Sequence, residues 1–160
     1  MLSFNFSGRT LTLNKKLDDY EKEHSIVKTQ FKNYEGDKTE SGDYAKIHHF
    51  LAKNKYADYT YGRFDWMMTN WDYLEDQYLN RIGIWQEVGE VVGVTLFDHS
   101  LDVIFPLVQE GYEELYGEMI EYAKSNMIRE ENPDFLIYAN DSNERLKNEL
   151  KCHGFIATEW

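Results

Sequence analysis

Two runs of β-forming residues separated by a single dipeptide are the strongest constraint on the fold of this chain. Residues 82–87 and 90–97 are rich in Ile, Val, Trp and Phe, and only Val88-Gly89 lies between them. A two-residue connection is the length of a tight hairpin turn, and glycine tolerates the positive φ that such turns require. The sequence therefore predicts an antiparallel hairpin, which is incompatible with an all-helical fold.

The segments around this hairpin alternate between strand and helix patterns. Apolar residues at helical spacing predict helices over residues 41–54, with Ser41 as N-cap, and over residues 65–80, 113–127 and 143–152. Strands are predicted over residues 26–34, 101–105, 135–139 and 155–159, and residues 2–6 and 10–13 are typical of a short hairpin. This order predicts an α/β (α+β) fold with a mixed, mostly antiparallel central sheet flanked by helices.

Size and charge limit the kind of protein. A chain of 160 residues with 42% hydrophobic residues is long enough for one domain with a single core. The 29 acidic residues exceed the 17 Lys and Arg residues and give a formal net charge of −12. Such a surface repels phosphate backbones and anionic lipids, so we expect neither nucleic acid nor a membrane as partner.

Cysteine and histidine usage argues against disulfides and metal. Cys152 is the single cysteine, so no internal disulfide and no thiolate cage can form. His48 and His49 are adjacent and point to different sides of a helix, so no metal site is expected. The sequence starts without the basic and apolar run of a signal peptide and has no long apolar stretch. A cytoplasmic location is the resulting expectation.

Two short motifs stand out in this order of elements. Ile82-Gly83-Ile84-Trp85 leads through Gly89 to Val92-Gly93-Val94, and the predicted helix that begins at Asn143 ends in Gly154-Phe155. In order and spacing they resemble the central hairpin and last helix of the GNAT superfamily, whose members acylate amines with acetyl-CoA. The resemblance covers residues 26–160 and implies a GNAT-like acyl-CoA N-acyltransferase fold, preceded by an amino-terminal extension over residues 1–25 that contains the short hairpin.

The resemblance also has implications for partners. Residues 63–67, followed by 82–85, are similar to the amino-terminal domain of bacterial members with two tandem domains. The chain ends one strand short of the usual last strand of the family, and an unpaired sheet edge is a liability. We therefore expect a second GNAT-like domain or a homodimer as protein partner, and a small-molecule amine or acyl-CoA as ligand.

The family's cofactor segment is only partly matched. The resemblance implies a mixed sheet that opens next to Phe105, with the helix that starts near Glu113 directed at the opening. The family pattern is Arg or Gln, two residues, Gly, one residue, then Gly or Ala, but its glycine positions are Tyr112 and Glu114 here. The acidic residues would repel a pyrophosphate by about 1 kcal/mol even in high dielectric, although acids are also common in any first helical turn. The cofactor-binding residues that the resemblance implies are Ile104, Phe105, Gln109, Gly111, Tyr112 and Asn143.

Catalytic groups are equally incomplete. The position of the family's tyrosine acid is Leu150 here, and Asn143, which matches a family asparagine, is also an ordinary N-cap residue. Glu87, Asp98 and His99 lie on or beside the central strands and are the candidates for a general base, yet such residues are common at strand ends. Two functions remain open: an N-acetyltransferase domain with a degenerate acetyl-CoA loop, or a non-catalytic GNAT-fold module for ligand binding or assembly.

Overall fold

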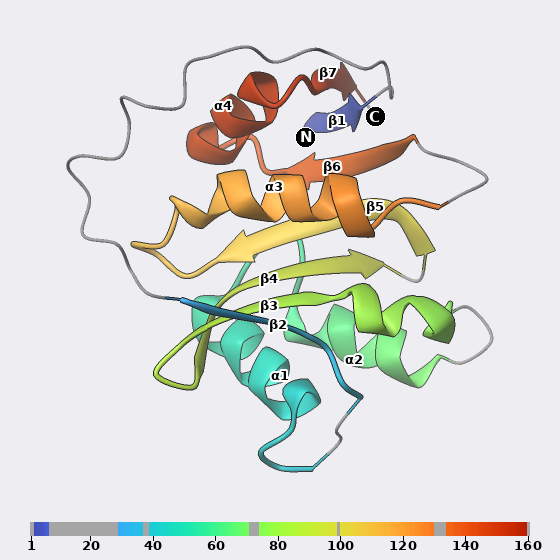
Figure 1. The fold of residues 1–160 in the computed structure, drawn as a ribbon, viewed down its shortest axis with the longest axis vertical. Helices are drawn as coiled ribbons and strands as arrows, with labels where there is room; N and C mark the ends of the chain where they lie inside the picture. Colours follow the sequence, from blue (N-terminus) through green and yellow to red (C-terminus); the bar gives the residue numbers. More distant parts are fainter. Residues whose placement is uncertain are drawn as a thin grey trace.

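A seven-stranded mixed sheet forms the centre of the molecule (Figure 1). The computed structural model describes residues 2–6, 29–36, 39–70, 74–98, 100–129 and 134–159. The strand order is β2-β3-β4-β5-β6-β1-β7. The bounds are β1 Leu2–Phe6, β2 Gln30–Asn33, β3 Gly83–Glu87, β4 Glu90–Asp98, β5 Ser100–Val108, β6 Phe135–Ala139 and β7 Ile156–Glu159.

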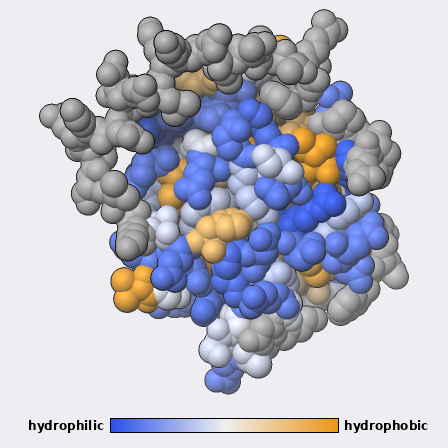
Figure 2. Space-filling view, in the orientation of Figure 1, coloured by the Kyte–Doolittle hydropathy of each residue, from blue (hydrophilic) through white to orange (hydrophobic). Residues whose placement is uncertain are grey.

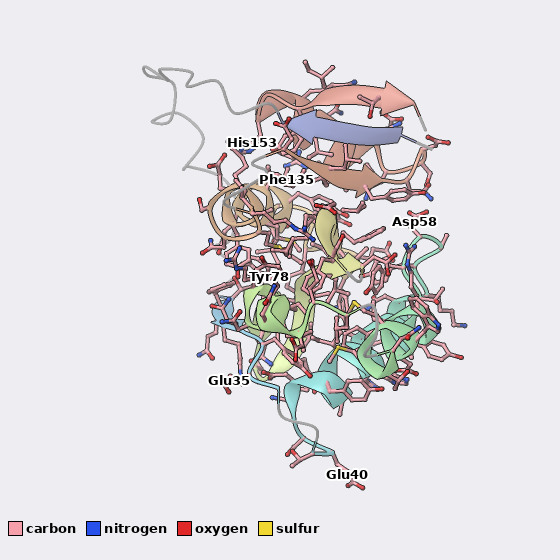
Figure 3. The ribbon with its side chains drawn as sticks, turned by 90° about the vertical axis from the view of Figure 1, so that its right-hand side faces the viewer. Glu35, Glu40, Asp58, Tyr78, Phe135 and His153 are labelled. Atoms are coloured by element: carbon pink, nitrogen blue, oxygen red, sulfur yellow. The ribbon has the colours of Figure 1, made fainter. Side chains whose placement is uncertain are left out.

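Helices cover both faces of this sheet (Figures 1 and 3). α1 (Asp43–Asn54) and α2 (Tyr61–Thr69) lie on one face, and α3 (Leu115–Asn126) and α4 (Glu144–Cys152) lie on the other. A 3₁₀ helix, η1 (Asp76–Arg81), precedes β3. Because both faces are covered, the central strands are apolar without alternation, and residues 91–97 of β4 are all buried. None of the described helices combines the length and the apolar character needed to cross a bilayer.

The pairing of the strands confirms a mixed and mostly antiparallel sheet. Five neighbouring pairs are antiparallel, and β5 and β6 are the parallel pair. Parallel neighbours need a crossover, and α3 provides it. Within the described residues, β5 and β6 pair only at Val103 with Leu136 and at Ile104 with Ile137. The sheet therefore opens immediately after Ile104, next to Phe105, as the family resemblance implies.

The amino-terminal strand lies inside the sheet, which differs from the sequence-based expectation. Phe4 of β1 is paired with Ile137 of β6 on one side and with Ala157 of β7 on the other, both antiparallel. Residues expected to form an extension outside the domain thus cover one edge of β6, and β7 becomes the outer strand. The expected pairing of residues 2–6 with residues 10–13 involves positions outside the described residues.

The central hairpin is confirmed, including its turn. β3 and β4 are joined by Val88, with φ 51°, and Gly89, with φ 84°. Two successive positive φ values match the twist of the flanking strands. Val88 is fully exposed, so its apolar side chain is tolerated at the tip of the turn without packing.

The predicted helix over residues 65–80 is wrong in extent. α2 starts earlier, at Tyr61, because the Thr60 side chain accepts a hydrogen bond of 3.2 Å from the Arg63 N–H and caps the helix. It ends at Thr69, and η1 forms the later part of the predicted span. The start of α1 differs as well: Gly42 rather than Ser41 is the N-cap residue, and it has no capping side chain.

Candidate functional site

A cleft of about 410 Å³ lies where β5 and β6 separate. We call it the β5–β6 cleft. Its lining comes from β5, β6, the α1–α2 connection and the first turns of α3 and α4. The lining residues are Tyr56, Ala57, Asp58, Phe105, Pro106, Leu107, Tyr116, Tyr138, Asn140, Ser142, Asn143 and Leu146. Aromatic rings and amides thus dominate the cleft, which suits a slender ligand with both apolar and amide groups.

The aromatic wall of the cleft continues the last paired positions of β5 and β6. Phe105 follows Ile104 and Tyr138 follows Ile137, and their ring centroids lie 5.2 Å apart. The Phe105 ring also contacts Tyr59 at 4.9 Å, and the Arg63 guanidinium carbon lies 4.9 Å from its centroid. Phe105 is buried and held on several sides, so this wall is rigid.

Asn143 joins the cleft to the start of α4. Its Oδ1 accepts a hydrogen bond of 3.0 Å from the Leu146 N–H, which confirms its N-cap role, and its Nδ2 donates to the Tyr116 hydroxyl at 2.8 Å. Burial raises the pKa of Tyr116, although the bond from Asn143 opposes that rise. The Tyr116 hydroxyl is therefore protonated at neutral pH and is a fixed proton donor at the cleft wall.

A second amide, Asn140, ties the strand side of the cleft to the α1–α2 connection. Its Nδ2 donates to Asp58 Oδ1 at 2.9 Å, and its Oδ1 accepts from the Ser142 N–H and hydroxyl at 3.0 and 2.7 Å. Nearby, the Tyr56 hydroxyl donates to the Val108 carbonyl at 2.5 Å, and burial raises the pKa of Tyr56. The side chains of Asn140 and Tyr56 are therefore held in fixed orientations by hydrogen bonds within the protein.

The turn before α3 holds the residues at which the family resemblance implies a pyrophosphate. Gly111 has φ 91°, and its N–H donates to both carboxylate oxygens of Glu113 at 3.1 Å. The Tyr112 hydroxyl donates to the Glu87 carboxylate, which raises the pKa of Tyr112. The Gln109 N–H donates to the Val92 carbonyl at 2.8 Å. The N–H groups of Gly111 and Gln109 thus donate to acceptors of the chain itself, and a pyrophosphate at Gly111 would have to displace the Glu113 carboxylate.

The predicted catalytic acids do not gather at one place. Glu87 ends β3 beside the turn before α3, whereas Asp98 ends β4 and forms an ion pair of 2.5 Å with Arg63. His99 lies outside the described residues. Among the predicted cofactor residues, Phe105 and Asn143 line the cleft, Ile104 is the buried last paired residue before it, and Gln109, Gly111 and Tyr112 form the separate turn before α3.

Sequence reasoning missed part of the cleft. Tyr56 and Asp58 belong to the α1–α2 connection, Tyr138 belongs to β6, and Asn140 follows the end of β6. Asp58 and Asn140 are 82 residues apart, so no local motif indicates that they meet. Leu150, at the position of the family's tyrosine acid, is fully buried in the core. In the part of the chain that the structure describes, no group of His, Cys, Asp and Glu gathers in a way that could hold a metal ion.

Other surface features offer less specific chemistry. A larger hollow of about 1140 Å³ lies between η1, β2 and the end of α3, and another of about 760 Å³ runs along α1. On the face seen in Figure 2, hydrophobic residues are scattered among hydrophilic ones rather than gathered in one patch. Comparisons with protein-family models, with curated proteins and with solved structures find no match for this chain. The β5–β6 cleft and the turn before α3 are the parts of the described structure with the most specific chemistry.

Proposed function

We propose that this chain is a GNAT-type N-acetyltransferase domain that transfers acetyl from acetyl-CoA to a primary amine at the β5–β6 cleft. One observation carries the proposal: the parallel pair β5–β6 separates after Ile104, and a cleft lined by the first turn of α3 lies at the opening. This is the arrangement that the motifs in the hairpin and in the last helix imply.

The neutral pantetheine arm of acetyl-CoA fits the cleft. One edge of β5 is paired with β4, and beyond Ile104 the opposite edge faces the cleft rather than β6. An extended chain with amide groups can pair with such an edge. Acetyl-CoA supplies an acetyl group activated as a thioester. The chain contributes the apolar wall around Phe105, which excludes water, and the protonated Tyr116 hydroxyl held by Asn143.

The charged part of the cofactor does not fit, so acetyl-CoA binding should be weak. Asp58 is the one charged residue among the described residues that line the cleft, and it is an acid. At the turn before α3, the Glu113 carboxylate already bonds the Gly111 N–H. A phosphate there would have to displace this carboxylate and remain close to its charge.

The same contact favours the second candidate, a non-catalytic GNAT-fold module for ligand binding or assembly. A turn that satisfies its own donor does not require an anion for stability. The buried Leu150 at the position of the family's tyrosine acid points in the same direction. In this reading the cleft binds a ligand, but no acyl group is transferred.

Calorimetric titration with two ligands tests the proposal. We expect S-acetylpantetheine, which lacks the phosphates, to bind at least as tightly as acetyl-CoA. Ala57→Trp places a large side chain at the cleft and should abolish binding, whereas Ala52→Trp, on α1, should leave it unchanged. Absence of acetylpantetheine binding, or binding that Ala57→Trp does not alter, would refute a cleft for the acyl arm. Release of CoA thiol with n-butylamine separates the two candidates, because only the transferase produces it.

A further inference from the structure

The β5–β6 cleft is lined from both faces of the sheet, and the two sides differ in chemistry. Tyr116 and Asn143 come from the side of α3 and α4, where the lining is neutral. Asp58 comes from the α1–α2 connection on the opposite face, where Figure 3 shows it apart from α3. One side therefore offers amide and hydroxyl groups, and the other offers a carboxylate.

The charge balance at the Asp58 side is negative. The charged groups that act on the Tyr138 hydroxyl are Asp58, Arg63 and Asp141. Arg63 is the cation of this group, but it is paired with Asp98 at 2.5 Å and lies against the Phe105 ring. Arg63 also donates to the Asp58 carbonyl at 3.0 Å, but its charge is offset by Asp98, so the Asp58 carboxylate leaves this side of the cleft negative. A cation entering at this side is attracted, and an anion is repelled.

Asp58 keeps capacity for a ligand. One of its oxygens, Oδ1, accepts the bond from Asn140, and a carboxylate offers about four acceptor positions. Asn140 is itself held by Ser142, so the carboxylate is oriented before any ligand arrives. Beside it, the half-buried Tyr138 provides an aromatic face, and ammonium groups bind such faces through the ring quadrupole.

We propose that Asp58 and Tyr138 bind the primary ammonium group of the acceptor at the α1–α2 side of the β5–β6 cleft. The inference rests on the proposed transfer to an amine and names the residues that select an alkylammonium over a neutral or anionic acceptor. Primary alkylamines carry a positive charge at neutral pH, since their pKa lies near that of lysine, about 10.4. The carboxylate then recognises the amine in the form in which it is abundant, and the ammonium group must release one proton to solvent before its nitrogen attacks the thioester.

The test uses n-butylammonium and its neutral counterpart n-butanol, titrated into the protein while the ring signals of Tyr56 and Tyr138 are followed by NMR. We expect n-butylammonium to shift these signals, to bind more weakly as salt rises, and to bind at least tenfold more tightly than n-butanol. Asp58→Asn should weaken n-butylammonium binding about five- to tenfold, the effect of one partly exposed charge and its hydrogen bond. Asp76→Asn, which removes an exposed acid on η1, should not change it.

Two further measurements test the ammonium site. Tyr138→Leu retains an apolar side chain without a ring, and it should weaken n-butylammonium binding because the ring face is lost. Equal affinity in Asp58→Asn and Asp76→Asn, or equal shifts with n-butanol, would overturn the ammonium site. Failure of S-acetylpantetheine to bind, with n-butylammonium binding intact, would instead overturn the proposed transferase and leave the ammonium site standing.

Discussion

The turn before α3 allows the effect of charge on cofactor binding to be separated from the effect of an occupied backbone donor. Glu113→Ala and Glu114→Ala each remove one negative charge from adjacent positions. The Glu113 carboxylate bonds the Gly111 N–H through both oxygens, at 3.1 Å, whereas Glu114 makes no capping bond at the start of α3. The two variants are therefore matched in charge and differ in whether Gly111 is released.

The expected magnitudes follow from these contacts. A carboxylate about 4 Å from a phosphate costs about 1 kcal/mol in high dielectric, which is about a fivefold change in Kd. Glu114→Ala should therefore tighten acetyl-CoA binding about fivefold. Glu113→Ala should add the gain from a free N–H that bonds a charged group, about 1.5 kcal/mol or more, hence about sixtyfold or more in total. Only the charge effect should shrink as salt rises, because ions screen charges and not a direct hydrogen bond.

Calorimetric titration with acetyl-CoA at two ionic strengths provides the measurement. Tyr112→Gly belongs in the same series, because relief of a steric block would improve binding with little dependence on salt. S-acetylpantetheine is the control ligand, and its affinity should be the same in all variants. Equal improvement by Glu113→Ala and Glu114→Ala would show that the bond to Gly111 has no effect. Tight acetyl-CoA binding by the unchanged protein would refute the whole argument for an occupied turn.

Two further predictions concern stability. A Cβ added at Gly83 would lie 2.9 Å from two aromatic rings, so Gly83→Ala should destabilise the fold by about 1–3 kcal/mol in urea unfolding. At Gly62 the nearest atom to an added Cβ is Thr60 Oγ1 at 3.8 Å, an ordinary contact, so Gly62→Ala should not destabilise the fold. Equal stability of both variants would contradict this packing. Burial opposes ionisation of Glu121, but hydrogen bonds from Lys124 and His153 outweigh it and lower the pKa of Glu121. Because the pKa is lowered in the folded protein, ionised Glu121 stabilises the fold at pH values above its pKa in the unfolded chain, and this stability is lost as pH falls through its pKa in the folded protein. Wild type should therefore lose more stability than Glu121→Gln between about pH 5 and 3. Parallel curves of stability against pH for the two proteins would refute this.

Sequence reasoning succeeded where the signal is local. The hairpin of β3 and β4 follows from two apolar runs and a turn whose φ values only a few residues adopt easily. The strand Phe135–Ala139 and the helix that begins after Asn143 have the predicted bounds to within one residue, because alternation and capping depend on neighbours in the chain.

The extent of the second helix was the exception among local elements. Its apolar residues continue at helical spacing past Thr69, which is why one long helix was predicted. Periodicity reports which side chains are buried and does not report where the backbone changes direction, so it cannot distinguish one helix from α2 followed by η1.

Composition and periodicity by themselves predicted the mixed α/β class and the hairpin, and the resemblance to the GNAT superfamily implied that the sheet opens next to Phe105. Only the tertiary structure decided that β1 enters the sheet between β6 and β7, because strand pairing joins edges that are far apart in sequence. Only it brought Asp58 to Asn140 across the cleft and turned the Glu113 carboxylate onto the Gly111 N–H. These contacts depend on the distance between groups in space, whereas a sequence pattern records their separation along the chain.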